Sequence, residues 1–326
     1  MHRFKEIDML KGLGIVFMIM GHQYYGEYFD KWIHAFHMPM FFLISGFLYH
    51  RPNILKKSIY NKVKSLLIPY VFFAFIHLTI MYIKNLLFGG TVKNLHLYIY
   101  HILIINTEGL PICGAIWFLT ALFFATIMFI VIDTYIPKTV IKVICVLISV
   151  YMGLIIPNKG IRLPLALDVS LVGVGLLFIG KTLRSIYEKI RIQKNCLLAV
   201  FGILGMVFGS IIINFNSIVN MRLGVYGIVV FFFINAVIMT ISLYLLCFMM
   251  SSKKNFIINE LSFIGQYSVV YLGFNQLILI LLKKINVTDL YLNFCIKIIS
   301  LILCLAILHI VAILITNSKV KGLIGK

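Results

Sequence analysis

The sequence predicts an all-α protein: a polytopic membrane bundle of about ten transmembrane helices, with both termini in the cytoplasm and one domain over residues 1–326. Of the residues, 62% are hydrophobic and only 12% are charged, and the mean hydropathy is +1.04. Soluble domains are closer to half apolar and a quarter charged. Apolar runs of about 18 or more residues recur along the chain, and each is long enough to cross roughly 30 Å of hydrocarbon.

The individual helices are placed by windows of high hydrophobicity. The start of the chain has a basic lead but no small-residue cleavage site, which favours a retained first helix over a cleaved signal peptide. The segment 91–107 is shorter and aromatic, which favours an interfacial or re-entrant element over a span. The ten predicted helices lie near 8–25, 32–50, 65–83, 114–134, 139–156, 165–183, 195–214, 224–250, 261–282 and 292–317.

The distribution of basic residues orients this bundle. If the N-terminus is cytoplasmic, the inner segments hold 20 of the 29 Lys and Arg residues and the outer segments hold 9. An excess of Lys and Arg in inner loops is the signal that orients membrane proteins. The net charge of +19 is dispersed between the spans rather than gathered on one face, so no nucleic-acid partner is predicted. The lipid bilayer is the expected surrounding, and the sequence does not indicate an oligomeric state.

Charged and polar residues inside spans are costly, and they are expected to face the interior of the bundle or water. In the first predicted helix, Lys11 and His22 are about 20° from alignment and about 16 Å apart along the axis, and Asp8 lies about 40° from His22 on the other side. The three therefore share one face. Two plainer interpretations stay open: Asp8 and Lys11 form an anchoring ion pair, and His22 simply sits at the outer interface.

The second predicted helix carries "WIHAFHMPMFFLISGFLYHR". His34 and His37 are three residues apart, and Pro39 is expected to kink the helix near them. One of the two histidines, His34, is expected to point to solvent. No acidic residue or cysteine stands at complementary spacing, and the six cysteines are scattered without a CxxC pair, so no metal site is predicted.

These two segments carry a family resemblance. "IDMLKGLGIVFMIMGH" followed by "FHMPMFFLISGFLY" resembles the start of the acyltransferase-3 family of bacterial membrane acyltransferases, and most of all its fucose O-acetylase-related branch. Later segments are similar to the family too: "LLIPYVFF", "AIWFLTALFF", "LALDVSLVGVGLLFIGK" and "LSFIGQYSVVYLGFNQ". The resemblance implies a multi-pass protein of the bacterial cytoplasmic membrane, with acetyl-CoA as acyl donor and an extracytoplasmic glycan or lipid-linked saccharide hydroxyl as acceptor.

The family pattern of a basic residue, ten residues and a histidine corresponds to Lys11 and His22. Lys stands where Arg is commoner, which makes bidentate phosphate binding less secure. Many members have a histidine where this chain has Asn275, and an amide orients a hydroxyl but does not shuttle protons at neutral pH. Loss of activity or altered activity is therefore an open alternative.

The leading hypothesis is O-acetyl transfer from acyl-CoA, with Asp8, His22 and His37 as catalytic residues and no metal. Lys11, Trp117, Phe118 and Asn275 are the predicted substrate-binding residues, although belt aromatics at the membrane interface are a plain alternative for Trp117 and Phe118. The rival hypotheses are a membrane transporter or substrate-carrying module on the same fold, and a non-catalytic partner in glycan assembly.

Overall fold

The computed structural model describes residues 4–88, 93–190, 196–282 and 290–325, which form helices joined by loops and contain no β-strand, only an isolated β-bridge between Asn220 and Val225. The chain divides into two compact units, each assembled from separate segments. The first unit comprises residues 1–50, 175–221 and 225–268. The second comprises residues 51–174, 222–224 and 269–326. A single domain over the whole chain stays a prediction.

Seven helices among the described residues are long and apolar enough to cross a membrane. A further pair, α12 (Phe256–Gln266) and α13 (Ser268–Leu282), is apolar and long enough only when the two are counted together, which gives up to eight. These helices support a multi-pass membrane protein, while the count of about ten and the cytoplasmic termini stay predictions. The seven are α5 (Ile68–Phe88), α7 (Trp117–Tyr135), α8 (Thr139–Asn158), α9 (Leu167–Ile190), α10 (Cys196–Ile212), α11 (Val229–Met250) and α14 (Leu290–Asn317).

The predicted continuous helix over 32–50 is wrong. The chain forms α2 (Glu27–His34) and α3 (His37–Phe47), separated by Ala35 and Phe36. Pro39 is the third residue of α3, in the first turn, where a missing backbone N–H costs nothing because it has no partner inside the helix. Pro39 therefore follows the start of a new helix instead of kinking an existing one.

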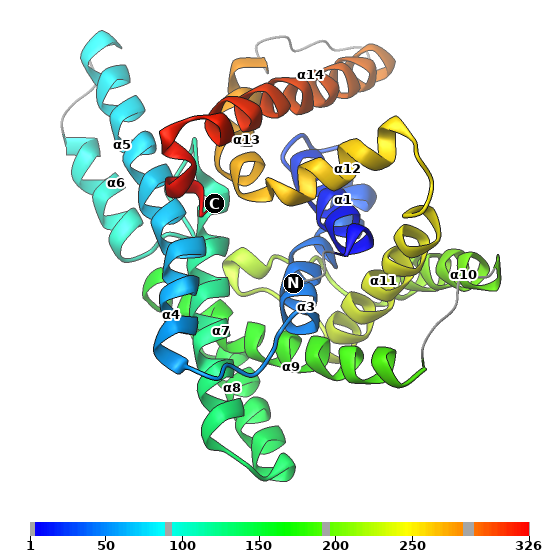
Figure 1. Ribbon diagram of the computed structural model, residues 1–326. Coiled ribbons are helices and arrows are strands. Elements are labelled where there is room, and N and C mark those ends of the chain that lie inside the picture. The colour runs from blue at the N-terminus through cyan, green and yellow to red at the C-terminus, as the bar shows by residue number, and fades with distance from the viewer. Residues whose placement is uncertain (1–3, 89–92, 191–195, 283–289, 326) are drawn as a thin grey trace. The chain divides into compact units, whose positions relative to one another are not determined.

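Within the first unit, α1 (Lys5–Gly21) and α12 lie side by side (Figure 1). Their backbones touch at two glycines: a Cβ on Gly12 would collide with the Leu261 carbonyl, and a Cβ on Gly265 would collide with the carbonyl of Asp8. Small residues allow this approach, and close packing is what associates helices in lipid, where tails are as apolar as the side chains. The Asp8 end of α1 is thereby fixed against α12.

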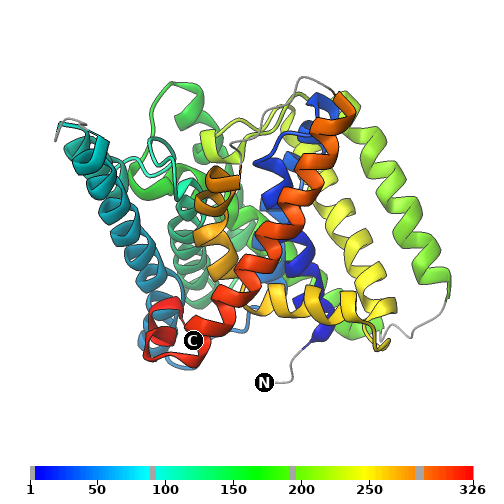
Figure 2. The ribbon, with the colours of Figure 1, turned by 90° about the horizontal axis from the view of Figure 1, so that it is seen from above.

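The other helices of the first unit complete a packed core. Helices α10 and α11 run alongside each other (Figure 2). The buried cluster joins α1, α3, α11 and α12. Its members are Ile7, Met9, Leu10, Phe36, Met40, Ile44, Met239, Leu243, Cys247 and Ile258.

The second unit begins with α4 (Leu55–Lys62), which continues through a π-helical turn (Val63–Leu67) into α5. Beside α5 lies α6 (Lys93–Leu103), whose 11 residues rise only about 16 Å, well short of a hydrocarbon core. The unit also contains α7, α8, the start of α9, nearly all of α13, α14 and a C-terminal 3₁₀ turn (Lys319–Ile324). Asp133 on α7, 2% exposed, pairs with Lys142 on α8 at 2.7 Å, as expected of a charge within a span.

Candidate active site

Helix α1 carries the predicted polar strip of the first unit. The helix is unbroken from Lys5 to Gly21, and His22 is its C-cap residue, still in right-handed helical geometry. Asp8 is buried, while Lys11 and His22 are partly exposed, and all three interact with neighbouring groups. Because the helix is regular, the shared face and the separation of about 16 Å between Lys11 and His22 follow from its geometry.

Three histidines come together where α1, α2 and α3 meet. His37 is buried, and its Nδ1 donates to the Ile33 carbonyl at 2.8 Å. His34 holds the Asp30 carbonyl in the same way, also at 2.8 Å. The two rings lie edge to face with centroids 5.1 Å apart. A nitrogen that donates to a carbonyl carries the proton, so in each neutral ring Nε2 keeps the lone pair and is the available base.

His22 belongs to the same group. A Cβ on the preceding residue, Gly21, would lie 3.3 Å from Cε1 of His34, which places the end of α1 against that ring. His22 is also close enough to His37 to act on it electrostatically. We call His22, His34 and His37 the histidine junction. Of the two histidines on either side of the break at residues 35 and 36, His34 is the more exposed, with 29% of its side chain accessible, and His37 is buried; that one of the pair points to solvent stays a prediction.

An aromatic group that the sequence interpretation missed supports the junction. Trp32 lies on α2 two residues before His34, and its indole Nε1 donates to Ser210 Oγ on α10 at 2.9 Å. Its ring packs edge to face on Phe36 at 4.8 Å and on Phe17 of α1 at 5.6 Å. In the sequence, a tryptophan close to two histidines indicates that Trp32 belongs to this group. Its partner Ser210 could not be predicted, because it is far away in sequence.

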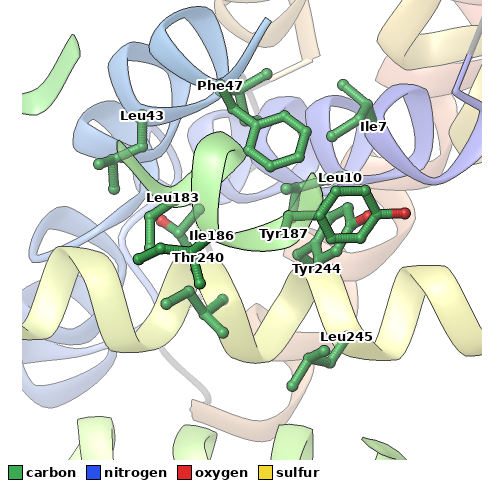
Figure 3. Close-up of a pocket in the computed structure, with 12 residues that line it drawn as sticks. Ile7, Leu10, Leu43, Phe47, Leu183, Ile186, Tyr187, Thr240, Tyr244 and Leu245 are labelled. Carbon is green, nitrogen blue, oxygen red and sulfur yellow. The ribbon is translucent and has the colours of Figure 1, made fainter. Parts of the chain in front are cut away.

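An apolar cavity of about 170 Å³ lies beside the polar strip (Figure 3). Ile7 and Leu10 face it from α1, and each precedes a strip residue, so the cavity is about 100° around the helix from Asp8 and Lys11. The hydroxyls of Tyr187 and Tyr244 are among the few polar atoms in the lining. The other lining residues are Leu43, Ile44, Phe47, Leu183, Ile186, Thr240, Ile241 and Leu245.

The remaining predicted residues belong to the second unit. Trp117 and Phe118 begin α7 and are 4% and 5% exposed, with their rings edge to face at 6.1 Å. Asn275 on α13 is completely buried, and its Nδ2 donates to the carbonyls of Tyr271 and Leu272 on its own helix, while its Oδ1 is buried with no partner among the described residues. The carboxamide thus holds its own helix, and a substrate contact by Asn275 stays a prediction.

The described residues contain no group of three or more His, Cys, Asp or Glu side chains that could hold a metal ion. In the histidine junction, two of the Nδ1 atoms already form hydrogen bonds with backbone carbonyl oxygens. Its chemistry is that of imidazole bases and hydrogen-bond donors.

Comparison with known protein families gave one match that covers nearly the whole chain. The acyltransferase-3 family model, described as an acyltransferase domain, matches residues 4–317. The chain is a member of this family. The comparisons with curated proteins and with solved structures each gave no match. This acyltransferase is thus a multi-pass membrane enzyme, and it does not transfer aminoacyl groups.

Proposed function

We propose that this acyltransferase moves an acetyl group from acetyl-CoA to a hydroxyl of a cell-surface glycan or lipid-linked saccharide in the bacterial cytoplasmic membrane, as a member of the fucose O-acetylase-related branch. The observation that supports this most is the position of His22. It ends the helix that bears Asp8 and Lys11, and it joins His34 and His37 in one group. A base at the end of a polar strip suits proton removal from an acceptor hydroxyl.

In the proposed step, Nε2 of His22 takes the proton of the acceptor hydroxyl while that oxygen attacks the thioester carbonyl. The new C–O ester bond forms, the C–S bond breaks, and the proton on His22 returns to the CoA thiolate. The imidazole of His37, held by the Ile33 carbonyl, orients His22 or stabilises the developing oxyanion. Asp8 lies within one turn of Lys11, about 21 Å along the axis from His22, and its proposed role is to orient the Lys11 ammonium at the donor end of the strip.

The donor is proposed to approach along the same helix. Lys11 supplies a positive charge for the CoA phosphates, and the adjoining cavity is apolar enough for an acyl-bearing chain. Acetyl-CoA is the donor that we propose.

The acceptor is proposed to contact Trp117, Phe118 and Asn275. Aromatic faces stack on sugar rings, and a carboxamide can orient a hydroxyl. Asn275 also favours the alternative function, membrane transport without acyl transfer, because an amide cannot replace a proton-shuttling histidine.

The test is transfer from radiolabelled acetyl-CoA to cell-surface glycan in cells that carry either the wild-type chain or the His22→Ala variant. Loss of the general base is expected to lower transfer by about 100- to 10,000-fold. His96→Ala serves as the control, because His96 is exposed on the short helix α6 and is expected to leave transfer unchanged.

Undiminished transfer in His22→Ala would remove the catalytic assignment. Uptake of a solute by the wild-type chain in liposomes that lack any acyl-CoA, combined with no transfer by the wild-type chain, would instead establish the transport alternative.

A further inference from the structure

The second unit contains a polar cluster that the proposed acyl transfer does not use. Its residues come from five separate segments: the loop around Thr107, the loop around Arg162, the start of α9, the 3₁₀ turn Met221–Leu223, and α13. The Arg162 side chain has a structural role in this cluster. Its Nε donates to Asp168 Oδ2 at 2.7 Å and its Nη2 donates to the Arg222 carbonyl at 3.0 Å. Arg162 therefore holds the backbone of Arg222 in place.

Only part of the Arg222 guanidinium is hydrogen-bonded among the described residues. Its Nε donates to the Thr107 carbonyl, and no other hydrogen bond or ion pair of its guanidinium is found among the described residues. Its Nη1 lies 3.3 Å from the point where a Cβ on Gly114 would stand. The Gln276 side chain reaches the same point, with Oε1 at 2.9 Å and Nε2 at 3.2 Å. Gln276 Oε1 also accepts from the Gly114 backbone N–H at 2.5 Å, so the Gln276 side chain already fills the space beside Gly114, and Arg222 Nη1 borders it.

The charge on Arg222 is incompletely balanced. Asp168 is fully buried and already paired with Arg162, so within the described part of the chain the exposed Glu108 is the opposite charge that acts on Arg222. Burial lowers the pKa of Arg222, the charge of Glu108 opposes this shift, and the neighbouring charge of Arg162 adds to it. A partly buried cation with open donors is stabilised by an anion that accepts from them.

Two buried oxygens in the cluster also lack partners. Thr107 Oγ1 and Asp168 Oδ1 are buried and make no hydrogen bond to any described residue. Thr107 is 2% exposed and Asp168 is fully buried. A hydroxyl such as that of Thr107 can donate to a bound oxygen atom, which adds a donor to those of Arg222. Unsatisfied buried polar groups are rare, so the Thr107 hydroxyl is the one of the two that supports a bound oxyanion, because an ionised carboxylate oxygen such as Asp168 Oδ1 only accepts.

We propose that the terminal nitrogens of Arg222, with the Thr107 hydroxyl beside them, bind a carboxylate or phosphate group of a ligand. The planar guanidinium group matches the geometry of both oxyanions, and it binds them most strongly through two parallel N–H donors. The two terminal nitrogens of Arg222 make no hydrogen bond to any described residue, so both can donate to a ligand. The cluster lies in loops that the charge pattern predicts to be extracytoplasmic. The oxyanion therefore belongs either to an acidic sugar or to a lipid headgroup. The proposal goes beyond the acyl transfer assigned to His22 and does not depend on it.

The test is equilibrium dialysis of the full-length chain in neutral detergent against radiolabelled inorganic phosphate, glucuronate or glucose. Phosphate and glucuronate are expected to bind at one saturable site, and glucose is not. Arg222→Gln is expected to weaken oxyanion binding by about 10- to 100-fold, the cost of a hydrogen bond to a charged group. Arg222→Lys should weaken it less, because the charge remains while the fork is lost.

The matched control is Arg184→Gln, which removes an arginine of the first unit and is expected to leave binding unchanged. If Arg222→Gln does not fold, Gly114→Ala replaces it, since the added methyl group would stand 3.3 Å from Arg222 Nη1 and crowd it. Equal oxyanion binding by wild type and Gly114→Ala or Arg222→Gln, or equal binding of glucose, would overturn the proposal.

The source of the oxyanion is distinguished in nanodiscs. If a lipid headgroup occupies the site, the wild-type chain is expected to bind less glucuronate in phosphatidylglycerol discs than in phosphatidylcholine discs. Equal glucuronate binding in both kinds of disc would support the acidic sugar.

Discussion

The two units gather their polar residues in opposite ways. In the first unit, the histidine junction comes from residues 22–37, a short stretch folded at one break between α2 and α3. In the second unit, Arg222 meets Thr107, Gly114 and Gln276, which come from distant parts of the chain. The first group is local in sequence, and the second exists only after long-range packing.

The difference teaches what each group depends on. The junction requires one helix end and one helix start, so local geometry and two carbonyl acceptors suffice to orient its rings. The Arg222 cluster depends on a buried ion pair, Arg162 with Asp168, that holds one loop against another. Disturbing a single residue is therefore expected to unfold the second group more readily than the first.

The largest expected effect is on Arg162→Ala. Asp168 is fully buried, and removing its partner leaves an uncompensated carboxylate, which is expected to lower the free energy of unfolding in detergent by about 3–5 kcal/mol. The control is Glu188→Ala in the first unit, which breaks an ion pair with Arg184 whose acidic side chain is 59% exposed. That change is expected to cost about 0–1 kcal/mol. Equal losses in chemical denaturation would show that the buried pair is not what holds the second unit's loops.

The same contrast explains what sequence could predict. Helix periodicity placed Asp8, Lys11 and His22 on one face of a helix that proved unbroken, because only local geometry is involved. Hydrophobic windows located most of the long helices within a few residues. They did not locate the break at Ala35 and Phe36, because an apolar run with a proline fits a kink and a new start equally well.

The partners across space could not be predicted. Arg162 and Arg222 counted only as loop charges in the orientation of the bundle, since nothing local shows that one would brace the other's backbone. Nothing in the sequence around Ser210 predicts that its hydroxyl accepts a hydrogen bond from Trp32. Contacts of this kind depend on how distant helices pack, which a single sequence does not encode in any periodic pattern.

The next effect in size concerns the inside of the histidine junction. His37→Ala removes the buried ring that contacts His34 and acts on His22, and misplacing a catalytic group is expected to cost about 100-fold in transfer rate. His37→Asn keeps a donor for the Ile33 carbonyl but has no base, so it is expected to restore stability without restoring turnover. The measurement is a split of kcat and KM. A rise in KM alone, or full activity in His37→Asn, would show that His37 is only structural.

The smallest expected effect is on the contact that fixes the strip. A Cβ at Gly265 would collide with the backbone carbonyl of Asp8, and a backbone atom cannot swing aside as a side chain can. Gly265→Ala is therefore expected to push α12 from α1, to cost about 1–3 kcal/mol of unfolding free energy and to lower transfer with it. Gly322→Ala in the second unit has nothing within 4 Å of its added methyl and is expected to stay within about 0.5 kcal/mol of wild type. If Gly265→Ala loses stability but transfers at the wild-type rate, then the position of Asp8 does not affect the reaction at His22.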